Sequence, residues 1–229
     1  SVYFETQLNY NRRFDDHTIG GLLLYNMRDY VTFDAANGIH SLPYRNQGTA
    51  GRISYSFRDL YFAEANFGYN GSENFKKGYR FGFFPSVAVG WMMTNESFMS
   101  NLMETLSKLK LRASWGLVGN DKIGGRRFAY IPTISGAGGY SWGYLGQHSR
   151  GGLQEEHFGI SDLTWETAEK INIGMELGLF NSINIQADLF KEYRKDIFMQ
   201  RKTIPEIAGY NNTPYANFGK VENKGLDLS

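Results

Sequence analysis

A period of two in side-chain polarity runs through nearly all of this 229-residue sequence. In the clearest segment, the apolar side chains from Tyr61 to Tyr69 alternate with Glu64, Asn66 and other polar or small residues. This alternation is typical of β-strands with one apolar and one polar face, so the sequence predicts an all-β fold. The segments with this pattern are residues 2–10, 19–28, 52–58, 61–70, 86–91, 109–116, 171–178, 183–189 and 217 onward.

The links between these segments alternate in length. Short links fall at residues 14–16, 58–59 and 180–182, and long links at about 31–46, 70–78, 119–164 and 198–216. Because antiparallel neighbours reverse direction at each link, the short links lie at one end of the sheet and the long links at the other.

One link at the short end is longer than the others. It spans about residues 93–108, and Phe98, Leu102 and Leu106 recur there at helical spacing after an N-cap-like Asn95. This spacing predicts one short amphipathic helix near residues 95–108.

Short turns at one end, long loops at the other and strands of about ten residues with one apolar face are typical of a transmembrane β-barrel. The composition agrees with this architecture, since 16% aromatic residues coexist with a mean hydropathy of -0.42. A formal net charge of +1 argues against an electrostatically driven nucleic-acid binder, and the absence of cysteine excludes disulfides and thiolate metal sites. A soluble β-sandwich, whose inner faces also alternate, is the competing interpretation.

Five stretches resemble the barrel region of TonB-dependent outer-membrane transporters of the SusC/RagA family. They occur in the order that the family has and are distributed over residues 61–225, which is most of the chain. The stretches are residues 61–91 (YFAEANFGYNGSENFKKGYRFGFFPSVAVGW), 109–120 (LKLRASWGLVGN), 163–166 (LTWE), 171–180 (INIGMELGLF) and 221–225 (VENKG).

The resemblance implies a barrel of 22 strands with an N-terminal plug, located in the outer membrane of a Gram-negative bacterium. Residues 1–229 are then an internal piece with about nine strands, and the plug domain, the TonB box and the remaining strands lie outside it. The family also implies import of oligosaccharides or peptides, a SusD-like surface lipoprotein and the TonB complex as partners, and contact with outer-membrane lipid.

Charges on the polar face are the first candidate site. Arg52, Glu64, Arg112 and Glu176 belong to a set of alternating sign on the predicted lumen face. Pairing with the plug or with one another is the leading interpretation, and direct substrate contact is the alternative.

Aromatic residues in the longest loop are the second candidate site. Tyr140, Trp142 and Tyr144 are spaced two apart, and His148 follows. These rings could stack on a sugar or pack against a partner protein, or the segment could be a self-packed loop or hairpin in which the aromatic side chains bury one another.

The sequence offers no catalytic constellation, no metal-ligand spacing among its four histidines and no nucleotide-binding glycine motif, so we expect neither an enzyme nor a cofactor. Two other functions remain open at this point. One is a passive outer-membrane porin or adhesin, and the other is a soluble β-rich carbohydrate-binding module.

Overall fold

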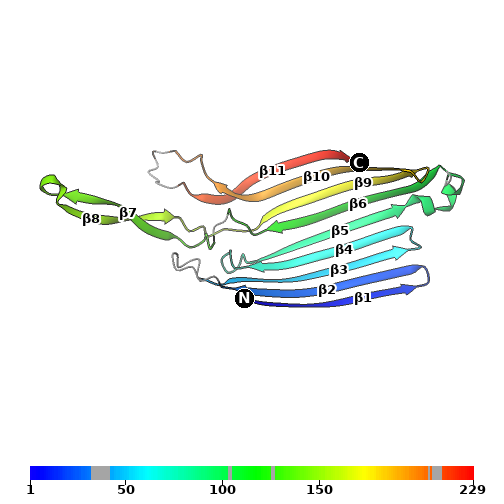
Figure 1. Ribbon diagram of the computed structural model, residues 1–229, viewed down its shortest axis with the longest axis horizontal. Helices are drawn as coiled ribbons and strands as arrows, with labels where there is room; N and C mark the ends of the chain where they lie inside the picture. Colours follow the sequence, from blue (N-terminus) through cyan, green and yellow to red (C-terminus); the bar gives the residue numbers. More distant parts are fainter. Residues whose placement is uncertain (32–41, 103–104, 125–126, 206, 208–212) are drawn as a thin grey trace.

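The computed structural model describes residues 1–31, 42–102, 105–124, 127–205, 207 and 213–229. Nine strands form one antiparallel sheet in the order β1-β2-β3-β4-β5-β6-β9-β10-β11 (Figure 1). Their bounds are β1 Val2–Phe14, β2 His17–Tyr30, β3 Tyr44–Phe57, β4 Tyr61–Ser72, β5 Phe81–Met92, β6 Leu106–Asn120, β9 Glu166–Leu179, β10 Ile183–Gln200 and β11 Tyr215–Leu228. The prediction of an all-β fold with nine strands is confirmed.

The short links are tight turns at one end of the sheet, as predicted. Asp15, Arg58, Asp59, Phe180 and Asn181 have φ between 48° and 53° in these turns. Asp and Asn tolerate this left-handed conformation better than most residues, because their side chains can bond to the local backbone. The strand ends that the long links join, and the described part of the segment between β6 and β9, lie at the opposite end (Figure 1).

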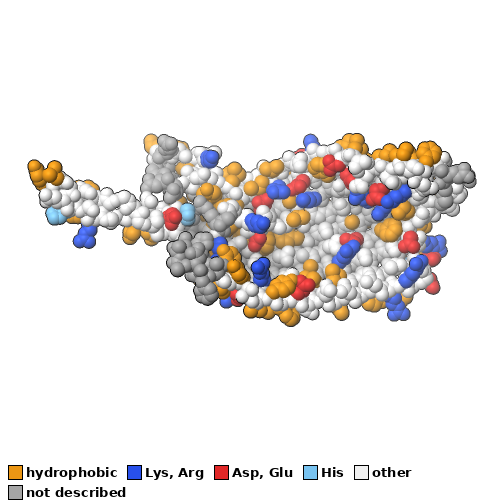
Figure 2. All heavy atoms as spheres, in the orientation of Figure 1, with side chains coloured by type: hydrophobic (Ala, Val, Ile, Leu, Met, Phe, Trp, Pro, Cys, Tyr) orange, Lys and Arg blue, Asp and Glu red, His pale blue; other side chains and the backbone are white. Residues whose placement is uncertain are grey.

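The register gathers most apolar side chains on one face of the sheet and most charged side chains on the other. Ala113 pairs with both Val89 and Ile173, and Ile173 pairs with Leu189. Val89, Ile173 and Leu189 are each close to 60% exposed, although apolar side chains in a water-soluble protein would be covered. The opposite face is the hollow of the curved sheet, where basic and acidic side chains interleave (Figure 2).

The link between β5 and β6 differs from the predicted helix. It contains two short 3-10 helices, η1 Met93–Asn95 and η2 Ser97–Leu102, and β6 already begins at Leu106. The prediction of a continuous amphipathic helix to residue 108 was therefore wrong, because Leu109 and its neighbours pair with β9 instead.

Glu96, between the two 3-10 helices, ties this link to the apolar face of the sheet. Its carboxylate accepts hydrogen bonds from the Tyr61 hydroxyl at 2.6 Å and from the Trp91 indole at 3.1 Å. The two rings stack with centroids 6.3 Å apart. Aromatic rings with one polar edge favour the level of lipid headgroups, so this cluster marks one boundary of the apolar band.

A separate two-stranded hairpin projects beyond the long-link end of the sheet (Figure 1). It consists of β7 Thr133–Trp142 and β8 His148–His157, joined through the 3-10 turn η3 Tyr144–Gly146. Since β6 pairs directly with β9, the segment that carries the hairpin is an insertion between two sheet neighbours. A hairpin was one of the alternatives that the sequence left open for this segment, but the bounds of its two strands were not predicted.

The fully buried side chains gather where this insertion joins the sheet. Phe75 and Leu163 are 0% exposed and pack with Ile123 and Ile160 in one cluster. The Trp165 ring covers the cluster, with its centroid 5.2 Å from that of Phe75. This cluster, which we call the loop-base core, holds the β4–β5 link and the insertion against the end of the sheet.

No helix in the described part of the chain has the length and apolar character needed to cross a membrane.

Candidate functional site

The hollow face of the sheet carries three of the four predicted lumen residues around one depression. The depression has a volume of about 430 Å³, and its lining includes Arg52, Glu64, Lys110 and Arg112. Strand alternation brings these side chains together, because β3, β4, β5 and β6 are consecutive neighbours and each contributes every second residue.

Arg52 and Glu64 form an ion pair from β3 to β4. The Asn66 side chain donates a second hydrogen bond to the Glu64 carboxylate at 2.8 Å. Both partners of the ion pair keep solvent access, so their attraction is screened and contributes modestly to stability. The pair places one carboxylate and one guanidinium in the depression, available to a further polar partner.

Arg112 makes the most buried contact of this face. Its Nη2 atom lies 2.9 Å and 2.6 Å from the two oxygens of Asp188, which is 8% exposed. The contact crosses β9, whose residue in this row is Gly174. A Cβ atom at Gly174 would collide with both side chains, so only glycine leaves room for this pair.

Glu176 lies beside this pair and not in the depression. Its carboxylate is 2.6 Å from the Lys108 amine and 3.6 Å from Arg112 Nε. Arg112 thus links Glu176 to Asp188, and the four predicted charges fall into two separate ion-pair groups. Asp188 belongs to the set of charges that the sequence places on the lumen face, whereas Gly174 was not predicted to matter for the site.

Arg52 and Arg112 of the depression each form an ion pair, but Lys110 has none within 4.0 Å among the described residues. Its amine lies 5.6 Å from the centroid of the Phe62 ring. Within the described residues no three metal-ligating side chains converge. The depression offers charged hydrogen-bonding groups of both signs.

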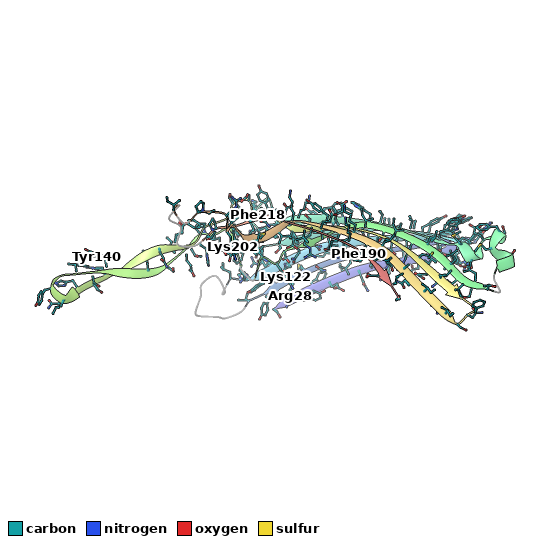
Figure 3. All side chains as sticks on the ribbon, turned by 90° about the horizontal axis from the view of Figure 1, so that it is seen from above. Arg28, Lys122, Tyr140, Phe190, Lys202 and Phe218 are labelled. Carbon is teal, nitrogen blue, oxygen red and sulfur yellow. The ribbon has the colours of Figure 1, made fainter. Side chains whose placement is uncertain are left out.

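The hairpin carries the second predicted site. Tyr140 and Trp142 stack with ring centroids 5.9 Å apart and an interplanar angle of 19°. His148 pairs with Trp142 across the hairpin, and its ring lies 5.9 Å from the indole. Tyr140 is 74% exposed near the far end of the hairpin (Figure 3). We call these three rings the hairpin stack.

Tyr144 does not join the hairpin stack. It lies in the 3-10 turn at the tip and is 82% exposed. The structure therefore brings together three of the four predicted aromatic and histidine residues, and it leaves the fourth pointing into solvent beside Leu145.

The sequence analysis did not identify the loop-base core, which supports the long links and the insertion beside the site. Its polar contacts include a hydrogen bond of 2.7 Å from Ser72 to Asp121 and two hydrogen bonds between Asn217 and the Thr164 backbone. Trp165 donates to the Arg80 carbonyl at 3.3 Å. Leu163 and Trp165 belong to the LTWE stretch, whose resemblance to the family pointed to these two residues. The sequence alone did not indicate that they pack in a buried cluster.

Residues 2–229 match the family model described as TonB dependent receptor-like, beta-barrel. TonB-dependent receptor P39 of Formosa agariphila is 29% identical over 98% of the chain and 23% of its own length. TonB-dependent receptor SusC of Bacteroides thetaiotaomicron is 32% identical over 78% of the chain and 18% of its own length. The chain thus spans less than a quarter of these curated relatives.

Solved structures share the same fold. The RagAB peptide importer in its closed-closed state superposes with a TM-score of 0.77 at 21% identity, over 99% of the chain and 27% of that chain. The siderophore receptor PirA from Pseudomonas aeruginosa superposes with a TM-score of 0.60 at 12% identity, over 99% of the chain and 38% of that chain.

Proposed function

The chain belongs to the TonB-dependent receptor β-barrel family, in its SusC/RagA branch, and we propose that it builds part of the wall of an importer energised through TonB. Proteins of this family lie in the outer membrane of Gram-negative bacteria, so the exposed apolar face of the sheet meets lipid. The observation that carries the proposal is this two-faced sheet, with an apolar outer face and a hollow, charged inner face.

We infer that the inner face contacts a plug domain supplied by the rest of the protein. Arg52, Glu64 and Lys110 present charges of both signs in one depression, which suits polar contacts that form and break during transport. Arg112 and Glu176 are tied into ion pairs of the wall itself, so we assign them to support of the depression.

The imported substrate is an oligosaccharide or a peptide in our proposal, captured together with a SusD-like surface lipoprotein. The hairpin lies at the end of the long links, which is the external end in bacterial barrels. Its exposed ring stack suits either a sugar face or the surface of the lipoprotein. RagAB, which is a peptide importer, supports the peptide alternative, and the oligosaccharide alternative rests on the resemblance to the SusC/RagA family.

Uptake by the full-length receptor tests the proposal. A strain lacking the gene is complemented with the wild type or with a variant whose TonB box is deleted, and growth on panels of glycans and peptides is compared. We expect the wild type to restore growth on one class and the deletion variant to fail. Growth restored equally by both would identify a passive porin, and release of the protein from carbonate-washed membranes would identify a soluble module.

Alanine variants of the hairpin stack separate its two possible contacts. Trp142→Ala removes the central ring, and Leu153→Ala is the control because Leu153 is 81% exposed on the same hairpin outside the stack. Loss of lipoprotein co-purification with Trp142→Ala would assign the stack to the partner. Retained co-purification with weaker uptake would assign it to the substrate, and normal behaviour in both assays would remove it from the site.

A further inference from the structure

Two lysines face outward from the sheet near the outer edge of its apolar band. Lys191 of β10 and Lys224 of β11 are directly opposite each other, in the row next to Leu189 and Leu226. Their side chains are 52% and 78% exposed. Strand alternation places them on the same face as these leucines, and therefore on the face that meets lipid. We call them the outer lysine pair.

The height of the outer lysine pair follows from strand geometry. Lys191 is eight residues beyond Ile183, which begins β10 at the short-turn end. Eight residues rise about 26 Å along the strand, and a tilt of 35–45° reduces this to about 20 Å along the membrane normal. The apolar band of such barrels is about 25 Å tall, so the flexible lysine stems bring their amines to the headgroups of the outer leaflet.

The charges around the outer lysine pair do not balance. Like charges directly opposite each other in a sheet repel. One carboxylate oxygen of Glu222 is shared between them, at 3.6 Å from Lys191 and 4.0 Å from Lys224. Alternation places Glu169 on the same face, one row closer to the long links. Its carboxylate accepts a hydrogen bond of 2.8 Å from the Trp115 indole.

Further lysines extend this excess toward the long links. By alternation, Lys195 continues the outward face of β10 and Lys220 that of β11, and both are exposed. Among the residues that the structure describes, the patch therefore has more amines than carboxylates at the depth where headgroup anions lie.

We propose that the outer lysine pair binds the phosphate of a phosphorylated glycolipid in the outer leaflet. Lysine amines bind phosphate as compact point charges, and an anion between Lys191 and Lys224 would relieve their repulsion. Leu189 and Leu226 lie next to the pair on the membrane side, where the acyl chains of the same lipid pack. The inference rests on the membrane placement of the barrel and not on import, so the two can fail separately.

Lipid retention by the full-length receptor tests this assignment. The protein is purified in detergent, exchanged into phosphatidylcholine nanodiscs with or without phosphorylated lipid A, and the lipid A bound per protein is measured by native mass spectrometry. Lys191→Gln combined with Lys224→Gln is the test variant. Lys170→Gln is the matched control. Lys170 lies at the same height as Lys191, because the next residue, Ile171, pairs with Lys191. The Lys170 side chain faces the lumen, however, where it contacts Glu192.

We expect the double variant to bind phosphorylated lipid A roughly tenfold more weakly or worse, since each amine near a charged headgroup contributes appreciably. The control and a double Lys→Arg variant at both positions should bind as the wild type does. A heat-dependent mobility shift on gels verifies that each variant retains a folded barrel.

Three results would overturn the assignment. The double glutamine variant could bind as tightly as the wild type, or dephosphorylated lipid A could bind as tightly as the phosphorylated form, which would reduce the contact to acyl packing. Millimolar inorganic phosphate could also displace the lipid completely, which would make this a general anion site and not a lipid site.

Discussion

Ile173→Arg is the sharpest test of the face assignment on which the membrane placement depends. Ile173 lies on the outward face of β9, is 58% exposed and pairs with Ala113 and Leu189. It is six residues from Leu179 at the short-turn end of the strand, which corresponds to about 20 Å along the strand and about 15 Å along the membrane normal. This depth is close to the middle of the apolar band.

The expected cost follows from that depth. An arginine at the bilayer midplane of a β-barrel destabilises it by about 2 to 4 kcal/mol, whereas the cost near an interface is about 0 to 1 kcal/mol. The midplane cost of about 2 to 4 kcal/mol corresponds to a change of roughly 30- to 700-fold in the folding equilibrium. Ile173→Arg should therefore deplete the folded receptor, while Thr167→Arg, on the same face near the long-link end, should have little effect.

The neighbouring residue provides the control. Asn172 faces the hollow side of the same strand and pairs with Ser114 and Phe190. An arginine there extends into the aqueous lumen, so Asn172→Arg should assemble nearly as the wild type does. The measurement is the amount of heat-modifiable full-length receptor in carbonate-washed outer membranes. Equal depletion by Ile173→Arg and Asn172→Arg, or a greater effect of Asn172→Arg, would refute the assignment of the lipid face.

Three further predictions concern the interior contacts. Asp188→Ala leaves the Arg112 guanidinium partly buried without its bidentate partner, and we expect a loss of about 1 to 3 kcal/mol by urea titration, of which Arg112→Met in the same chain restores a part. Gly174→Ala forces a methyl group between the same two side chains and should lower the urea midpoint in the same direction. Phe75→Ala removes a ring that is 0% exposed from the loop-base core, at a cost of about 3 to 5 kcal/mol, and should expose the insertion to limited proteolysis; Phe98→Ala, at a position that is 61% exposed, should not.

The strands and their two faces could be predicted because the signal is local. Alternation in a segment such as 171–178 fixes which side chains share a face, and links of two or three residues force antiparallel neighbours. The register adds detail but changes none of these assignments. Ile173 and Asn172 are on opposite faces whichever residues they meet on β6 and β10.

The link after β5 shows where a local signal fails. Phe98, Leu102 and Leu106 have the spacing of a helix, yet Leu106 is already in β6 and pairs with Leu179. The hydrogen bonds of a neighbouring strand outweigh a weak helical propensity over so short a segment. In the described part of this link, helical turns occur before the sheet begins, in η1 Met93–Asn95 and η2 Ser97–Leu102.

The ion pairs of the lumen face could not be assigned to partners from the sequence. Arg112 meets Asp188 across β9, and this contact requires that β6 pair with β9 directly although the insertion separates them in the chain. It also requires a glycine at position 174 in the intervening strand. Alternation predicts the face of each charge, but the register across an insertion is a long-range property.

The strands of the hairpin could not be located from the sequence for a different reason, which bears on the role of the hairpin. β7 contains Gly136, Gly138 and Gly139, and both of its faces are largely exposed, so its side chains show no apolar and polar division that alternation could reveal. A segment without an apolar face cannot form part of a wall that contacts lipid. Because β6 and β9 already pair along their lengths, changes in the hairpin leave the register of the wall intact. The external contacts of this receptor can therefore vary independently of its barrel, with the loop-base core as the joint between them.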